Sequence, residues 1–173
     1  MKELSVINDL PITLHRSIGK LVAKYAHLEY VMQTIVFELV GLSPEIGRTF
    51  IRQPRAKEVY DMIKDLAFIN EITLSKEYDV IGTALAQCET ERDMVAHGVW
   101  MRDRGSKSIH LRITSGTWQP DKNGPQKIKR RITPEAREYG IEEMASTISL
   151  VEATIEAVWR LKEDLKPHLK KRG

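Results

Sequence analysis

A long stripe of apolar residues between Thr13 and Val40 constrains the fold more than any other feature of the sequence. Its members recur every three or four positions: Ile18, Leu21, Val22, Tyr25, Leu28, Met32, Ile35, Val36 and Leu39. This spacing places them along one side of an α-helix, and an apolar side of that length needs other elements to cover it. Gly41 follows the stripe and predicts the end of the helix.

The same spacing recurs in three further segments and predicts a bundle of helices. Apolar residues line the segments 55–69 and 75–97, and Ser75 is the expected N-cap of the second one. The tripeptide Thr133-Pro134-Glu135 predicts the start of a last long helix, because it supplies a cap, a proline at the first position and an acid. Since the links between helices are short, we expect a mainly α fold, an antiparallel bundle of four to five helices.

Residues 99–133 have a different pattern and predict a small β insert before the last helix. The runs 99–104 and 108–114 are rich in β-favourable residues and predict a hairpin. Gly, Pro, Asp and Asn are frequent in residues 115–126, which predicts a loop, and residues 127–132 are expected to return as a third strand. We expect the insert to lie within one domain that spans residues 1–173.

This insert is strongly basic, whereas the rest of the chain is mildly acidic. Its acids are Asp103 and Asp121, and its nine basic residues are Arg102, Arg104, Lys107, Arg112, Lys122, Lys127, Lys129, Arg130 and Arg131. The insert therefore carries 9 − 2 = +7, which leaves 18 − 22 = −4 of the chain's 27 basic and 24 acidic residues for the remainder. A basic patch suits a nucleic acid, although a solvated surface loop has a similar composition.

Two tryptophans lie in the basic insert. Trp100 and Trp118 could stack on unpaired bases, as aromatic side chains among cations do in proteins that bind single strands. The alternative is that they pack the small sheet onto the helices. The sequence leaves both interpretations open.

Composition indicates the class of protein and its compartment. No run approaches the about 18 apolar residues of a membrane span, and the N-terminus lacks the apolar core of a signal peptide. The single cysteine, Cys88, cannot form an internal disulfide. The five histidines are scattered, so we expect no metal and no cofactor. We expect a cytoplasmic protein that does not enter a membrane.

Arg92, Asp93 and His97 form the most informative group of polar residues, near the end of the helix predicted for residues 75–97. An arginine can hold phosphate oxygens, and a histidine can move a proton near neutral pH. Asp93 lies four residues before His97, on the same side of a helix, and can orient the imidazole. Arg92 and His97 are about 500° of rotation apart, which leaves roughly 140° between their side chains. Arg92 must therefore reach around the helix, or two copies of the motif must converge in a dimer.

The same residues also have a structural interpretation. His97 followed by Gly98 is a favourable helix end, because a cation there interacts well with the helix dipole. Arg92 would then form an ion pair with Glu89 or Glu29. The spacing alone does not discriminate, because Arg104 and His110 repeat it inside the insert.

The heptapeptide Arg-Asp-x-x-Ala-His-Gly that begins at Arg92 resembles the HEPN superfamily, whose motif is Arg-x4-6-His with a polar residue after the arginine. Asp93 stands where asparagine is commoner. Leu28-Glu29-Tyr30 is similar to the opening helix of such proteins, in which an acidic residue faces the motif. The resemblance covers residues 13–98 and 134–166 and leaves the basic insert unmatched.

This resemblance implies a metal-independent endoribonuclease that acts as a homodimer in a toxin–antitoxin or phage-defence system, where an antitoxin protein is a partner. His97 would take the proton from a ribose 2′-OH or protonate the leaving 5′-oxygen, and Arg92 would stabilise charge on the phosphate. Asp93 would orient His97, and Glu29 and Glu89 would support the site. The products would carry 2′,3′-cyclic phosphate and 5′-hydroxyl ends, and DNA would be inert. The alternative is a non-catalytic HEPN-like helical module that binds nucleic acid or a partner protein.

Overall fold

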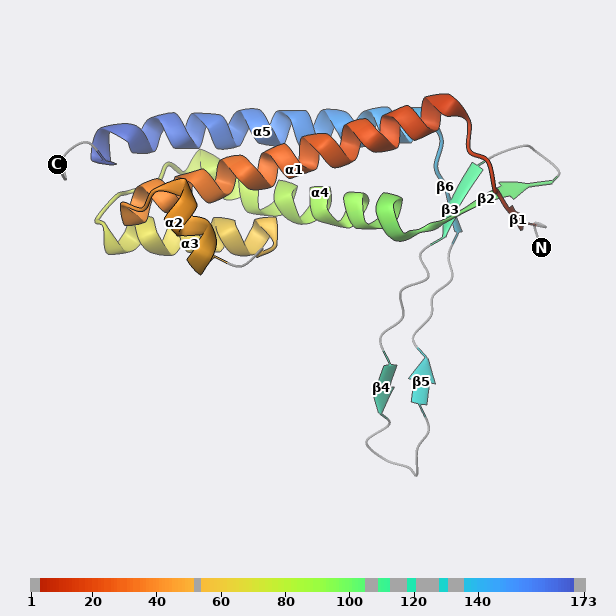
Figure 1. Ribbon diagram of the computed structural model, residues 1–173, viewed down its shortest axis with the longest axis horizontal. Coiled ribbons are helices and arrows are strands. Elements are labelled where there is room, and N and C mark those ends of the chain that lie inside the picture. The colour runs from red at the N-terminus through yellow and green to blue at the C-terminus, as the bar shows by residue number, and fades with distance from the viewer. Residues whose placement is uncertain are drawn as a thin grey trace. The chain divides into compact units, whose positions relative to one another are not determined.

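The computed structural model describes residues 4–51, 54–104, 109–112, 118–120, 128–130 and 136–169. Five α-helices lie in these ranges (Figure 1): α1 (Ile12–Val40), α2 (Pro44–Phe50), α3 (Ala56–Ile69), α4 (Asp79–His97) and α5 (Ile141–Leu169). A single 3₁₀ turn, η1 (Lys76–Tyr78), precedes α4. The predicted mainly α class with a small β insert is confirmed. Among the described helices, none is long and apolar enough to cross a membrane.

The chain divides into two compact units, which we describe one at a time. The helical unit comprises residues 19–92 and 145–173, and the sheet unit comprises residues 1–18 and 93–144. Arg92 is therefore the last residue of one segment of the helical unit. Asp93 and His97 belong to the sheet unit.

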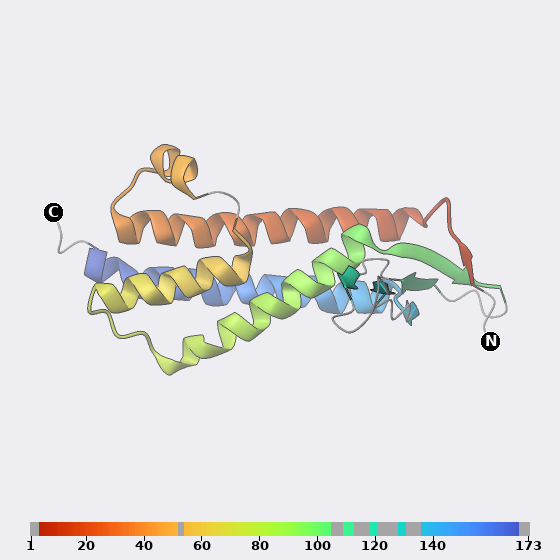
Figure 2. The ribbon, with the colours of Figure 1, turned by 90° about the horizontal axis from the view of Figure 1, so that it is seen from below.

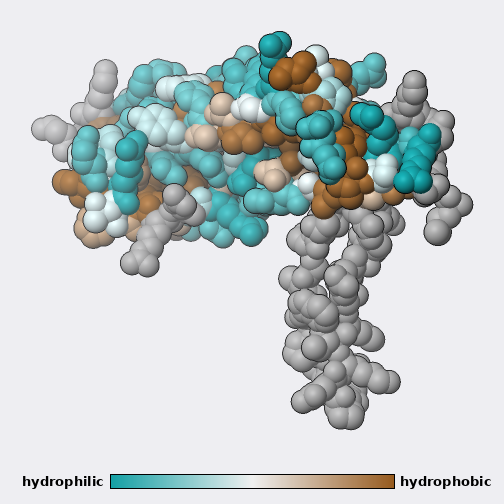
Figure 3. Space-filling model, turned by 45° about the vertical axis from the view of Figure 1, so that its right-hand side comes forward, coloured by the Kyte–Doolittle hydropathy of each residue, from teal (hydrophilic) through white to brown (hydrophobic). Residues whose placement is uncertain are grey.

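The core of the helical unit contains the apolar stripe of α1 that the sequence predicts. Leu21, Leu28 and Met32 are fully buried, and most of the other predicted positions beyond residue 19 are buried as well. Val22 is the exception, because it is 44% exposed and lies beside the stripe. The outer surface is mixed, with apolar patches among polar side chains (Figure 3), which is usual for helices that face water.

Within the predicted helical bundle, α1 and α5 run parallel and not antiparallel. Lys20 and Lys24 of α1 both bind Glu152 of α5, at 3.2 and 3.3 Å, and Lys162 of α5 binds Glu38 of α1 at 2.8 Å. Contacts that advance together along both helices mean that α1 and α5 run parallel in the helical unit (Figure 2). The parallel pair was not predicted because α1 and α5 are far apart in the chain and share no local pattern. α4 and α5 run antiparallel, as predicted: Tyr78, directly before α4, donates a hydrogen bond to Asp164, whereas Cys88, further along, contacts Thr154.

The helices α3 and α4 are also antiparallel, as predicted. Arg55, just before α3, binds Glu89 near the end of α4 at 3.3 Å. Tyr60, further along α3, lies against Gly82, where a Cβ would be 3.2 Å from the tyrosine ring. The contacts thus advance along α3 while they recede along α4.

Glycine also determines how α2 lies on α1. A Cβ built on Gly47 would be 2.3 Å from the ring of Phe37, so no larger residue fits without moving that ring. Pro44 opens α2, and the Ser43 side chain accepts a hydrogen bond from the backbone N–H of Ile46. This combination of a serine cap and a proline at the first position is a common start for a helix.

The sheet unit contains a four-stranded antiparallel sheet in the order β1-β2-β3-β6. Its strands are β1 (Leu4–Val6), β2 (Val99–Asp103), β3 (Ile109–Arg112) and β6 (Ala136–Glu138). A separate ladder joins β4 (Trp118–Pro120) to β5 (Ile128–Arg130). The pairing of β2 with β3 agrees with the predicted hairpin, whose turn lies outside the described residues.

Two details of the predicted insert are wrong. The strand expected at residues 127–132 pairs as β5 with β4 and not with the hairpin, whose third strand is β6. The last helix begins at Ile141 and not at residues 133–135, which lie outside the described part of the chain. The reason is a local cap: the backbone N–H of Gly140 donates to Oε2 of Glu143 at 2.8 Å, which stabilises a helix that starts immediately after Gly140.

Candidate active site

Gly98 fixes the end of α4 in the sheet unit. Its backbone N–H donates to the carbonyl of Met94 at 2.9 Å. A Cβ at this position would lie 2.5 Å from that carbonyl oxygen and 2.6 Å from Cδ1 of Leu111 on β3. The glycine predicted to stop the helix is therefore required by close packing.

His97 is the last residue of α4, and its side chain is exposed. Asp93 lies four residues earlier in the same helix and is partly buried. Residues four apart share one side of an α-helix, so Asp93 can support the imidazole from that side. An exposed histidine at a helix end can approach a large substrate and exchange a proton with it.

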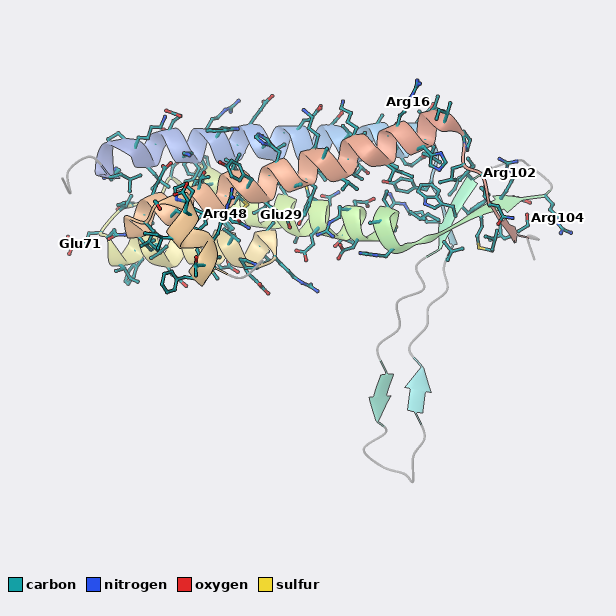
Figure 4. All side chains as sticks on the ribbon, viewed as in Figure 1. Arg16, Glu29, Arg48, Glu71, Arg102 and Arg104 are labelled. Carbon is teal, nitrogen blue, oxygen red and sulfur yellow. The ribbon has the colours of Figure 1, made fainter. Side chains whose placement is uncertain are left out.

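Arg92 contacts an aromatic ring and a carboxylate inside the helical unit. Its guanidinium carbon lies 4.6 Å from the centre of the Tyr25 ring, and its Nη2 is 3.8 Å from Oε1 of Glu29. Both partners come from α1, and Figure 4 labels Glu29 there. Only 26% of the Arg92 side chain is exposed. A cation held over an aromatic ring and beside a carboxylate is well fixed in position.

Glu89 forms its recorded ion pair with Arg55, at 3.3 Å between Nη1 and Oε1. The carboxylate side chain is 13% exposed and the arginine side chain 72% exposed. Arg55 is also the N-cap of α3, and its backbone N–H donates to Oε2 of Glu58 at 3.1 Å. From the sequence, Arg55 is only the start of a helix, and nothing in the pattern signals its pairing with Glu89.

Tyr25 lies at the centre of these charges. Burial raises the pKa of its hydroxyl, the carboxylates of Glu29 and Glu89 raise this pKa further, and the charge of Arg92 partly opposes them. Tyr25 therefore stays protonated at physiological pH. We call Tyr25, Glu29, Arg55, Glu89 and Arg92 the Arg92 cluster. It holds two guanidinium groups and two carboxylates.

The candidate nucleic-acid residues on the sheet are placed only in part. Arg102 and Arg104 are exposed at β2 and directly after it (Figure 4). Arg112 lies on β3, and Lys129 and Arg130 lie on β5, in the other sheet. Lys107, Lys127 and Arg131 are outside the ranges that the structure describes.

The two tryptophans differ in what the structure places. Trp100 is partly buried on β2, and its ring meets Tyr139 edge to face, with centroids 6.0 Å apart. This contact favours packing over base stacking for Trp100. Trp118 lies on strand β4.

The second Arg–His pair of the sequence has a different setting. His110 is on β3, directly opposite Met101 of β2, and only 4% of it is exposed. Arg104 is exposed. A buried histidine in a strand cannot contact a polymeric substrate as the exposed His97 can. Burial therefore distinguishes the Arg92–His97 pair from the Arg104–His110 pair, although their spacing in the sequence is similar.

Neither a metal centre nor a reactive thiol is indicated by the described residues. No group of three or more His, Cys, Asp or Glu side chains is placed to hold a metal ion among the described residues. Cys88 is fully buried beside Thr154, and burial raises the pKa of its thiol, which makes it a poor nucleophile.

Comparison with known proteins identifies no relative. No protein-family model matches the chain, and no curated protein or solved structure matches it. Function must therefore be inferred from the residues and their contacts.

Proposed function

We propose that this protein is a metal-independent endoribonuclease of the HEPN type, which acts in the cytoplasm as a homodimer. The observation that carries the proposal is the 3.8 Å pair between Glu29 of α1 and Arg92 of α4. An acidic residue of the first helix that faces the motif arginine is what the resemblance implies. The pair holds Arg92 partly exposed, which suits a residue that must receive a phosphate.

The proposed roles follow from the chemistry of the three motif residues. Arg92 stabilises the negative charge that develops on the phosphate, and His97 transfers the proton at the ribose 2′-OH or the 5′-oxygen. Asp93 orients His97. The products carry 2′,3′-cyclic phosphate and 5′-hydroxyl ends, and DNA is not cut because it lacks the attacking 2′-OH. Toxin–antitoxin and phage-defence systems are the settings we propose for such an activity.

The test is incubation of the wild-type protein and its His97→Ala variant with end-labelled RNA in EDTA. We expect the wild type to cut RNA and leave cyclic phosphate, and His97→Ala to be inactive. His15→Ala is a matched control, since His15 is also an exposed histidine of a helix. Equal cleavage by wild type and His97→Ala would refute the proposed role of His97. DNA of the same sequence should remain intact.

A second candidate function is non-catalytic binding of nucleic acid. The exposed arginines at β2, Arg102 and Arg104, favour it. In that case the protein binds RNA with strong salt dependence, His97→Ala has no effect, and Arg102→Gln with Arg104→Gln weakens binding. Loss of cleavage in His97→Ala with unchanged binding would favour the endoribonuclease instead.

A further inference from the structure

Arg55 and Glu89 form an ion pair whose two members are exposed to very different degrees. The Arg55 side chain is 72% exposed, whereas the Glu89 side chain is 13% exposed. The carboxylate side chain is thus mostly buried, whereas the arginine side chain lies largely in solvent. A single ion pair of this kind is weak enough to exchange partners.

Glu89 also connects Arg55 to Arg92. Residues 89 and 92 are three apart on α4, so their side chains are neighbours on the helix surface. Both Glu29 and Glu89 act on the hydroxyl of Tyr25, and Arg92 lies over the ring of the same tyrosine. Arg55, which comes from the start of α3, is therefore brought into the surroundings of Arg92 by Glu89.

We propose that Arg55 is a second phosphate-binding residue, and that Glu89 holds its guanidinium in the free protein until an RNA phosphate displaces the carboxylate. This inference rests on the proposed function and adds a binding residue to the same site. A carboxylate and a phosphate are both anions that accept hydrogen bonds from a guanidinium group, so a phosphate can replace the carboxylate as the partner of Arg55.

The two arginines differ in the freedom that this exchange requires. Arg92 is 26% exposed and fixed between Tyr25 and Glu29, so it is a rigid contact for one phosphate. Among the residues that the structure describes, the ion-pair partner of Arg55 is Glu89, and most of the arginine side chain faces solvent. A long exposed side chain can turn toward a bound strand, and a neighbouring phosphate of that strand is a suitable target.

The experiment measures binding of a single-stranded RNA oligonucleotide by fluorescence anisotropy at several salt concentrations. All variants are made in the His97→Ala background, so that the RNA stays intact. Arg55→Gln should weaken binding and lower the slope of log K against log salt by about 0.7, the value for one phosphate contact on a single strand. Glu89→Gln should tighten binding about threefold, because Arg55 is released. The double variant should bind like Arg55→Gln alone.

Glu163→Gln is the matched control for Glu89→Gln. Glu163 is an exposed acid paired with Lys166 at 2.5 Å, so the substitution changes the net charge equally and also releases a cation. Equal effects of the two substitutions would show a general charge effect and would overturn the proposal. Arg55→Lys, which keeps the charge and loses the two-pronged donor, should be intermediate and serves if Arg55→Gln does not fold.

The outcomes separate this inference from the proposed function. If wild type cuts RNA but Arg55→Gln and Glu89→Gln bind like the parent, Arg55 is not a phosphate contact and the endoribonuclease stands. If wild type does not cut RNA but the two variants change binding as expected, the endoribonuclease fails and the phosphate contact stands. If the parent does not bind RNA, the phosphate contact is wrong, and cleavage by the wild type alone decides on the endoribonuclease.

Discussion

Glu29 of α1 and Arg92 of α4 lie 3.8 Å apart, and the guanidinium of Arg92 also covers the ring of Tyr25 at 4.6 Å. One side chain thus joins two helices of the helical unit through a charge and an aromatic face. The arrangement can stabilise the fold and prepare Arg92 for a phosphate at the same time. Stability and activity must therefore be measured separately in its variants.

Substitution of Arg92 tests how much of its role is structural. Arg92→Ala removes the contact with Tyr25 and leaves Glu29 without this cation, so we expect a loss of about 1–2 kcal/mol in the free energy of unfolding. Urea denaturation measures it, with Arg160→Ala, an exposed arginine of α5, as the control. Arg92→Lys should recover part of the stability but little RNA cleavage. Recovery of full cleavage by lysine would contradict a two-pronged phosphate contact.

Gly47 and Gly19 form a matched pair of glycines in helices. Gly47→Ala places a methyl group in the ring of Phe37 and should destabilise the protein by about 1–3 kcal/mol. Gly19→Ala meets nothing within 4 Å and should stabilise it by about 0.5–1 kcal/mol, because alanine has a smaller entropy cost in a helix. Thermal denaturation of both variants measures these two changes in stability. A neutral Gly47→Ala would mean that α2 does not pack closely on α1.

Gly98 is predicted to be essential for the shape of the helix end that carries His97. Gly98→Ala brings a methyl group against the Met94 carbonyl and the Leu111 side chain, and we expect a loss of about 1–3 kcal/mol. Because the clash adjoins His97, RNA cleavage should fall even in the fraction that remains folded. Circular dichroism and a cleavage assay on the same samples test this. Unchanged stability would show that the helix end tolerates a side chain.

Alkaline pH should weaken the helical unit through Tyr78. Burial first, and then its hydrogen bond to Asp164, raise the pKa of the Tyr78 hydroxyl from 10.0 to about 12. A raised pKa contributes stability that is fully present below pH 10 and is lost as the pH rises toward 12, because the unfolded chain ionises first. Unfolding midpoints at pH 9 and pH 11.5 should therefore differ more for wild type than for Tyr78→Phe. An equal decrease in both proteins would assign the effect to other groups.

Local patterns predict the helices well because they depend on neighbouring residues. The apolar stripe of α1 lies in the core where it was expected, and α4 ends at His97, next to the glycine that predicts its end. The start of α5 was missed because two competing signals occur within ten residues. The cap between Gly140 and Glu143 is the one observed, and a three-residue strand precedes it. Such a short strand leaves no periodicity to detect.

The candidate site was also predicted only in part from the sequence. The motif residues Arg92, Asp93 and His97 are recognisable in the sequence, and Glu29 and Glu89 were both candidate partners for Arg92. That Arg92 contacts Glu29, while Glu89 holds Arg55, depends on where α1 and α3 lie against α4. No local pattern carries that information, because the partners are 34 and 63 positions apart along the chain.

The sequence by itself determines that this chain forms long amphipathic helices with a basic β segment, since side-chain spacing and charge are local properties. The tertiary structure alone decides that α1 and α5 run parallel, that Leu4–Val6 joins β2 as an edge strand, and that Arg55 meets Glu89. Each of these contacts joins residues far apart in the chain. Their formation depends on the packing of whole elements, which bury apolar area together and leave only certain charged side chains within reach of one another.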